Sequence, residues 1–445
     1  MGGNWLSQNK VRPGAYINFK SVPRPSMVVG DRGIGTMALP LTWGATGELI
    51  EVHSTDLLDG TSLAKVGVTA FDEETEPSAK LLTLMLSGCY LAKVYRLDIG
   101  GSKATATIGT LTATAAYAGT FGNKITISAT ENNGTFTVTT FVNGASQDTQ
   151  TVATLQELES NAFVRFSGEG TPTANAGTPL TGGTNGTYTA ATAYPAYTNI
   201  ASRARWQAMA VPFDGATVNA QIAEFAKTMR DGEGRYIQVA LANYDDADYH
   251  GVINSDCGVR RANDEVNAEE ATAWVAGITA GASIVQSNVG KVFPGALSLM
   301  KERSNSEIIA ALQAGKFILS ANQRGEIVIE NDINSLHTFT PELNEDWSLN
   351  QVVRVMDEIG TSLSDIWEQR YKGKVQNNAD GRGIFKAEII GYMFQLQNLG
   401  AIDEFLGAED IDISRGTALD AVLADLRAKA IVAVSKLYMT VRLQG

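Results

Sequence analysis

The sequence is poor in the residues that carry most enzyme chemistry. Its 445 residues include only three histidines and two cysteines. Cys89 and Cys257 lack metal-ligand spacing, and a disulfide framework is unusual in so long a chain, so we expect two buried thiols in a reducing compartment. His53, His250 and His337 lie far apart and flank no serine in a nucleophile-elbow pattern, which argues against a serine hydrolase.

Positive charge and long apolar runs are also scarce. The formal net charge of −13 argues against binding to nucleic acid or to an anionic membrane surface, because both need clustered Lys and Arg. The longest weakly polar run, residues 272–285, is too short to span a bilayer. The N-terminus lacks the apolar core of a signal peptide. We therefore expect a soluble protein made in the cytoplasm.

The composition is that of a folded chain with several domains. Hydrophobic residues make up 44% and charged residues 19%, which is typical of globular proteins. The length predicts about two to four domains. We expect an α/β (α+β) multidomain protein with an N-terminal arm (1–26), a small α/β domain (27–98), an inserted β domain (99–198), an α/β core (199–344) and a C-terminal domain (345–445).

Two amphipathic helices are predicted between residues 346 and 399. Apolar residues recur at helical spacing from Val352 to Ile366 and again from Ile384 to Leu399. Asn350 is expected to cap the first helix. The polar side of that helix is interpreted as a solvated outer face, and its charged residues are Arg354, Asp357, Glu358, Asp365 and Glu368.

The segment from residue 101 to 198 differs in composition from the rest. It contains 24 threonines and only eight charged residues. Thr-rich alternation with Asn-Gly turns predicts half-exposed antiparallel strands, with one short helix over 155–161. We interpret it as an inserted surface domain whose replacement by a linker leaves the rest folded.

Three local patterns suggest ligand sites, and each has a simpler explanation. The glycine-rich loop 30–35 lacks a following Gly-Lys-Ser/Thr, so we favour a turn leading into a strand over 39–43. His250 with nearby Asp residues and Cys257 suggests a metal or cysteine site, but an acidic loop explains it better. The acidic run 244–249 lacks the glycine and glutamate of a calcium loop. No cofactor is expected.

Alternating strands and helices between residues 199 and 344 predict a mixed or parallel sheet covered on both faces. The clearest elements are a buried helix over 268–281 and a hairpin joining 317–319 to 326–330. Residues 421–434 are ambiguous, because their Ala and Leu content favours a helix whereas residues 430–434 could form a strand.

Two strand-like segments at the chain ends have no local hairpin partner. Their backbone groups must therefore pair elsewhere, because unpaired amides are costly when buried. The first is Ala15, Tyr16, Ile17, Asn18 and Phe19. The second is Leu437, Tyr438, Met439, Thr440, Val441, Arg442 and Leu443.

Several separated motifs resemble contractile phage tail sheath proteins. They are NKVRPGAYINF near the start, KFILSANQRGEIVIENDINSLHTFT, VVRVMDEI, YKGKVQNNADGR, FKAEIIGYMFQL and KLYMTVRL at the end. They occur in the family's order and cover both termini and most of the second half. The resemblance is weak between about residues 100 and 198.

The resemblance implies a structural role. It implies sixfold rings stacked around a tail tube, a core that is subtilisin-like in fold only, and a C-terminal domain completed by terminal strands exchanged between subunits. Contraction would drive the tube through a cell envelope without a cofactor. Implied partners are other copies of the chain, the tube, the baseplate and the tail terminator, with assembly in the host cytoplasm and then residence in a virion tail or phage-tail-like particle.

The resemblance also places the C-terminal domain on the inside, so Arg354, Asp357, Glu358 and Asp365 become candidates for contact with the tube. Two alternatives remain open at this point. One is a hydrolase with a subtilisin-like fold, and the other is a static fibre or surface-layer protein. Two terminal strands without local partners favour head-to-tail exchange between identical subunits.

Overall fold

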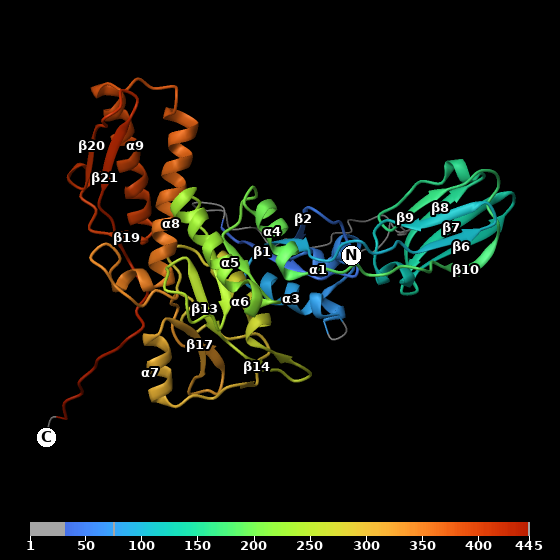
Figure 1. Ribbon diagram of the computed structural model, residues 1–445, viewed down its shortest axis with the longest axis horizontal. Helices are drawn as coiled ribbons and strands as arrows, with labels where there is room; N and C mark the ends of the chain where they lie inside the picture. The colour runs from blue at the N-terminus through green and yellow to red at the C-terminus, as the bar shows by residue number, and fades with distance from the viewer. Residues whose placement is uncertain (1–31, 74–75, 444–445) are drawn as a thin grey trace, which may run out of the picture.

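The computed structural model describes residues 32–73 and 76–443. Along its long axis lie a β-sandwich, a central α/β region and a C-terminal region of helices and small sheets (Figure 1). The arm predicted at residues 15–19 and the core strand predicted at 27–29 lie outside the described residues.

An eight-stranded mixed sheet forms the centre, as the alternating pattern predicts. Its order is β18-β17-β13-β12-β11-β1-β3-β2, and only the edge strands β18 and β2 are antiparallel to their neighbours. The strands are β1 Ile34–Leu39, β2 Leu49–His53, β3 Leu91–Arg96, β11 Ala208–Ala210, β12 Gln238–Ala242, β13 Val252–Asp256, β17 Lys316–Ala321 and β18 Ile327–Ile329.

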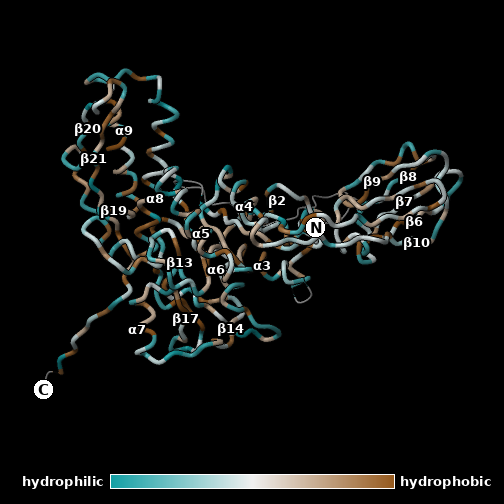
Figure 2. Tube along the Cα trace, viewed as in Figure 1, coloured by the Kyte–Doolittle hydropathy of each residue, from teal (hydrophilic) through white to brown (hydrophobic). Residues whose placement is uncertain are grey.

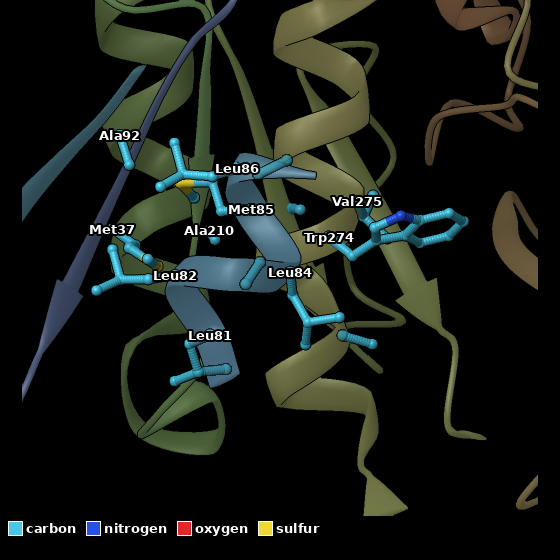
Figure 3. Close-up of a cluster of buried hydrophobic side chains, with 14 of the residues drawn as sticks. Met37, Leu81, Leu82, Leu84, Met85, Leu86, Ala92, Ala210, Trp274 and Val275 are labelled. Carbon is cyan, nitrogen blue, oxygen red and sulfur yellow. The ribbon is translucent and has the colours of Figure 1, made fainter. Parts of the chain in front are cut away.

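Helices cover both faces of this sheet. On one face α3 (Pro77–Leu86) and α6 (Ala268–Gly281) join a large apolar cluster, part of which is drawn in Figure 3. The two helices cross closely, because a Cβ on Gly277 would lie 2.2 Å from the Met85 carbonyl oxygen. On the other face α4 (Ala190–Ala201) and α5 (Gly215–Lys227) build a second cluster. Hydrophobic residues accordingly concentrate in these central elements (Figure 2).

Shorter elements complete the central region. The prediction of a helix over 268–281 and of the hairpin β17–β18 is confirmed. The remaining short elements of the central region are α1 Asp56–Asp59, α2 Thr61–Val66, α7 Asn305–Gln313, and a small sheet of β14 Val259–Arg260, β15 Glu265–Val266 and β16 Ser298–Leu299.

The strand predicted over 39–43 is wrong in position. The strand is β1, which starts at Ile34 inside the glycine-rich loop and ends at Leu39. Every residue of β1 is buried, so it lacks the alternation that marks a half-exposed strand. Glycine suits the second position of β1, because a Cβ added to Gly35 would lie only 3.0 Å from the Met85 sulfur. Ile34 and Gly35, at the end of this glycine-rich segment, therefore belong to the core.

The inserted domain is a β-sandwich, as its composition predicts. One sheet has the order β4-β5-β9 and the other β10-β6-β7-β8, all antiparallel. The helix expected over 155–161 is only a 3-10 turn at Leu155–Glu157. The strands are β4 Thr105–Ile108, β5 Leu111–Ala115, β6 Ile125–Asn132, β7 Thr135–Val142, β8 Ala145–Val152, β9 Val164–Ser167 and β10 Asn175–Pro179.

The boundary expected at residue 198 falls inside a core helix. Tyr194 and Tyr197 of α4 are fully buried against the central sheet, and the Tyr197 hydroxyl lies 2.9 Å from Thr36 Oγ1. The return from the sandwich to the core therefore precedes α4. The composition did not reveal this boundary, because the segment rich in threonine and alanine continues into α4.

The sandwich is anchored to the core by two buried side chains. Trp43, from the loop after β1, lies in the sandwich cluster with its ring centroid 5.0 Å from that of Phe121. Arg96, at the end of β3, forms an ion pair with Asp98 and donates to the carbonyls of Gly44 and Ala118. Because Ala118 belongs to the inserted segment, Arg96 links the central region directly to the β-sandwich.

The C-terminal region contains the predicted helix pair. The first helix is α8 (Asn350–Ile366), which continues as a π-helical turn at Trp367–Tyr371, and the second is α9 (Ala379–Asn398). Residues 421–434, which the sequence left ambiguous, contain strands. The paired strands are β19 Ile402–Asp403 with β22 Lys429–Ala430, and β20 Ile411–Arg415 with β21 Val422–Leu426. In the described part of the chain, no helix has the length and apolar character to cross a membrane.

Candidate assembly surfaces

The aspartates near His250 are exposed, as the interpretation of an acidic loop predicts; they are Asp245, Asp246 and Asp248. His250 and Cys257 are buried. Burial, and then the nearby Arg230 charge, lower the pKa of His250 to about 4, so the imidazole is neutral at pH 7. Cys257 is fully buried and donates to the Phe317 carbonyl. Within 32–73 and 76–443, no group of His, Cys, Asp and Glu side chains is placed to hold a metal ion.

Both thiols are expected to be unreactive in the folded protein. Burial raises the pKa of Cys89 and of Cys257 to about 12, and the thiolate is the reactive form. A colorimetric thiol reagent at pH 8 should label neither cysteine in buffer and both in urea. Rapid labelling of one thiol in buffer, with the Cys89→Ala and Cys257→Ala variants to assign it, would contradict this expectation.

The polar side of α8 is not the solvated face that the sequence predicts. Arg354, Asp357 and Glu358 are buried, with exposed fractions of 0%, 6% and 4%. Asp365, near the end of the helix, and Glu368, in the turn that follows, are exposed, and the Asp365 side chain lies 3.7 Å from Arg205. The interpretation of a solvated face is therefore wrong for the first three residues, which the central region covers.

Two buried ion pairs join α8 to the central region. Arg230 binds Asp357 through both terminal nitrogens, at 2.6 and 2.9 Å. Arg354 donates to Asp332 at 2.9 Å and to the Gln286 carbonyl at 2.7 Å. A bidentate pair of this kind fixes orientation as well as distance. We call these four charged residues, Arg230, Asp357, Arg354 and Asp332, the α8 seam.

Amides extend the α8 seam. Asn350, which the sequence predicts as a cap, is the first residue of the helix, and Leu349 occupies the cap position. The Asn350 side chain donates to Asp332 at 2.9 Å and accepts from Gln238 at 3.0 Å. The Asn350 side chain therefore joins α8 to the central region and does not accept hydrogen bonds from the backbone amides of the first helical turn.

The second half of α8 packs against α9 through apolar residues. Val355, Ile359, Phe385 and Ile389 belong to one buried cluster, together with Met393 and Leu396. This is the amphipathic packing that the sequence predicts for the helix pair. A single helix thus joins the core through charges and the C-terminal region through hydrophobic contact.

The chain leaves the C-terminal region as an extended segment. The last anchors are the Ile431 amide, which donates to the Ala401 carbonyl, and the Ala433 amide, which donates to the Gln351 side chain. Beyond them residues 434–443 project away from the body (Figure 1). We call these ten residues the C-terminal tail.

Large apolar side chains of the C-terminal tail face solvent. Tyr438 is 89% exposed and Leu443 98% exposed. The strand predicted over 437–443 is absent from the described single chain, where its backbone groups have no hydrogen-bonding partner. An apolar, strand-forming segment without a partner is typical of a surface that another chain covers.

Sequence reasoning found the tail but missed the α8 seam. The sequence feature that could have indicated burial of this face is the spread of apolar residues around the first half of α8. Val352, Val353 and Val355 lie on more than one side of the helix, and all three are buried. A helix that is apolar on several sides is buried on several sides.

Comparison with known proteins connects these features to one family. The phage tail sheath protein beta-sandwich domain matches residues 100–185, the central domain matches 184–335 and the C-terminal domain matches 342–444. The first junction agrees with the structure, in which α4 belongs to the core. The phage-like element PBSX protein XkdK of Bacillus subtilis is 33% identical over 99% of both chains.

Solved structures give the same result. The sheath tail protein of Desulfitobacterium hafniense has a TM-score of 0.80 and 37% identity, covering 97% of this chain and 100% of that one. The contracted helical sheath of the anti-feeding prophage shares the fold, with a TM-score of 0.55, 11% identity and coverage of 97% and 99%. The chain belongs to the phage tail sheath protein family and is a structural sheath subunit.

Proposed function

We propose that this chain polymerises as stacked hexameric rings around a tail tube, and that the polymer contracts to drive the tube through a cell envelope. Family membership and the exposed C-terminal tail support the proposal. Baseplate and tail terminator proteins are the further partners. Assembly takes place in the host cytoplasm, and the product is a virion tail or a phage-tail-like particle.

The observation that carries the proposal is the C-terminal tail. An extended segment pairs about four to six residues when it adds to a sheet. Each hydrogen bond adds about 1 kcal/mol net, so one tail holds its neighbour weakly. Many tails along a tube hold it strongly, because every further contact forms at a high effective concentration. The N-terminal arm, including Ile17, is proposed to act in the same way.

We also propose that the core domain has a subtilisin-like fold. This is a proposal about the fold alone and implies no catalytic role.

For contact with the tube, burial of Arg354, Asp357 and Glu358 leaves Asp365 as the exposed candidate among the four predicted residues. A charge at such a surface would guide register more than it would add affinity.

Removing the C-terminal tail should prevent polymerisation and leave the monomer folded. A chain that ends at residue 433 keeps both anchors of the last segment, and the described side chains that it loses, those of residues 434–443, all face solvent. Sedimentation and negative-stain microscopy of concentrated protein, with thermal melting as the control, measure the two effects. Normal tubes from the shortened chain would contradict strand donation, and static fibres or sheets from the intact chain would contradict a contractile sheath.

A further inference from the structure

His250 lies where the central region meets the start of α8. Its ring contacts that of Trp347, with the centroids 5.3 Å apart, and Trp347 belongs to the 3-10 turn Glu345–Ser348 that leads into α8. The His250 carbonyl accepts a hydrogen bond from Gln238, whose side chain also donates to Asn350, the first residue of α8. Both the ring and the backbone of His250 therefore take part in the junction between the two regions.

Two buried nitrogens at this junction have no hydrogen-bonding partner among the described residues. They are His250 Nδ1 and Arg230 Nε. A guanidinium nitrogen can only donate, whereas an imidazole offers an acceptor nitrogen only while the ring is neutral. A protonated imidazole would bring a further buried donor to a place where one donor already lacks an acceptor. The junction is therefore built for the neutral ring.

Three charged side chains act on the imidazole, namely Arg230, Asp231 and Asp357. Both carboxylates are engaged elsewhere. Asp357 binds Arg230 through both terminal nitrogens of the guanidinium, and Asp231 accepts a hydrogen bond of 2.8 Å from the Tyr249 hydroxyl. Burial, and then the Arg230 charge, outweigh the two carboxylates and lower the pKa of His250 to about 4. A proton on His250 would therefore weaken the surroundings of the Arg230–Asp357 pair.

The segment before α8 does not compensate such a charge. Glu345 and Asp346 of the 3-10 turn are exposed, so the turn meets the imidazole through Trp347, which carries no charge. By contrast, the second half of α8 packs against α9 through apolar side chains, whose contacts do not depend on pH. Protonation at His250 therefore acts on the polar half of α8 alone.

We propose that His250 is an acid switch at this junction. When the imidazole takes up a proton, the 3-10 turn Glu345–Ser348 and the first turns of α8 separate from the core, while the central sheet and the β-sandwich stay folded. Opening brings the imidazolium and Arg230 into contact with water, which removes the cost of two neighbouring buried cations. This inference goes beyond the proposed function, because it concerns a single chain and does not depend on assembly.

The pH range of the switch follows from linkage. A histidine whose pKa is lower in the closed junction binds fewer protons there than in the open one, so closure is favoured above pH 6.5 and is lost as the pH falls toward 4. With a pKa of about 4 in the closed state and 6.5 in the open state, the opening equilibrium should rise about 60-fold between pH 7 and pH 4.5.

Hydrogen exchange of the full chain at pH 7 and pH 4.5, corrected for the intrinsic pH dependence of exchange, measures this opening. Amides of residues 345–358 should lose protection about 60-fold at pH 4.5, whereas amides of β7 in the sandwich should not. His250→Phe retains an aromatic ring beside Trp347 but takes up no proton, so its protection should be the same at both pH values. His53→Phe is the matched control at an exposed histidine and should behave as the parent chain does.

A second measurement needs no variant at position 250. The chain has three histidines, so isotope labelling of histidine gives three ring signals, and the control variant assigns one of them. The His250 signal should titrate together with the loss of protection at residues 345–358. Equal acid opening in the parent and in His250→Phe would overturn the switch, and so would simultaneous loss of protection in β7. If His250→Phe does not fold, titration of the His250 ring without opening of residues 345–358 would overturn it.

Discussion

Arg354→Met should destabilise the folded protein by about 3–5 kcal/mol, although the substitution retains most of the side-chain volume. The guanidinium is fully buried and is the charged partner of Asp332, which is 3% exposed. Without it, the carboxylate keeps hydrogen bonds from Asn350 and from the Asn288 amide but loses its ion pair with Arg354. Urea unfolding followed by tryptophan fluorescence measures the loss.

The matched control is Asp365→Asn on the same helix. Asp365 is half exposed and its ion pair with Arg205 is long, so the change should stay within about 0.5 kcal/mol. Neutralising both partners, with Arg354→Met and Asp332→Asn together, should recover much of the stability, because a buried pair costs less to replace than to break. An Arg354→Met variant as stable as the Asp365 control would show that the Arg354–Asp332 pair contributes nothing to stability.

The α8 seam also explains where sequence reasoning reached its limit. The helix pair was predicted because apolar residues recur at helical spacing, and α8 and α9 confirm it. Its charged face was assigned to solvent because charged helix faces usually are solvated. A buried ion pair and a solvated one have the same spacing in sequence. The partners Arg230 and Asp332 lie 127 and 22 residues away, so only the tertiary fold identifies them.

The central strand was predicted in the wrong position, whereas the terminal strand stays a prediction that needs a second chain. β1 is a strand without alternation, because helices cover both of its faces. Residues 437–443 alternate as a strand does, but the described chain offers them no partner. Alternation of apolar and polar residues detects a half-buried strand well. It does not identify a strand that is buried on both faces, and it does not show whether the hydrogen-bonding partner of a strand belongs to another chain.

Trp43→Ala should be comparably damaging, at about 3–5 kcal/mol for a buried tryptophan. The indole is fully buried in the sandwich cluster, where Tyr117 meets it edge-on at 5.2 Å, and its Nε1 donates to the Ala64 carbonyl. Because Trp43 belongs to the core chain and packs in the inserted domain, its removal should also loosen the junction. Thermal unfolding measures the first effect, and hydrogen exchange at residues 116–122 measures the second.

The position of Trp43 changes what deletion of the inserted domain is expected to do. Replacing residues 101–198 would remove most of α4 and expose the indole, so the remaining domains should not fold as the composition suggested. A linker that replaces only 101–185, combined with Trp43→Ser, keeps α4 and should give soluble protein. Phe71→Ala is the matched control, because that ring is 88% exposed and its loss should be near neutral. Equal melting of the Trp43→Ala and Phe71→Ala variants would mean that the Trp43 side chain does not contribute to the stability of this junction.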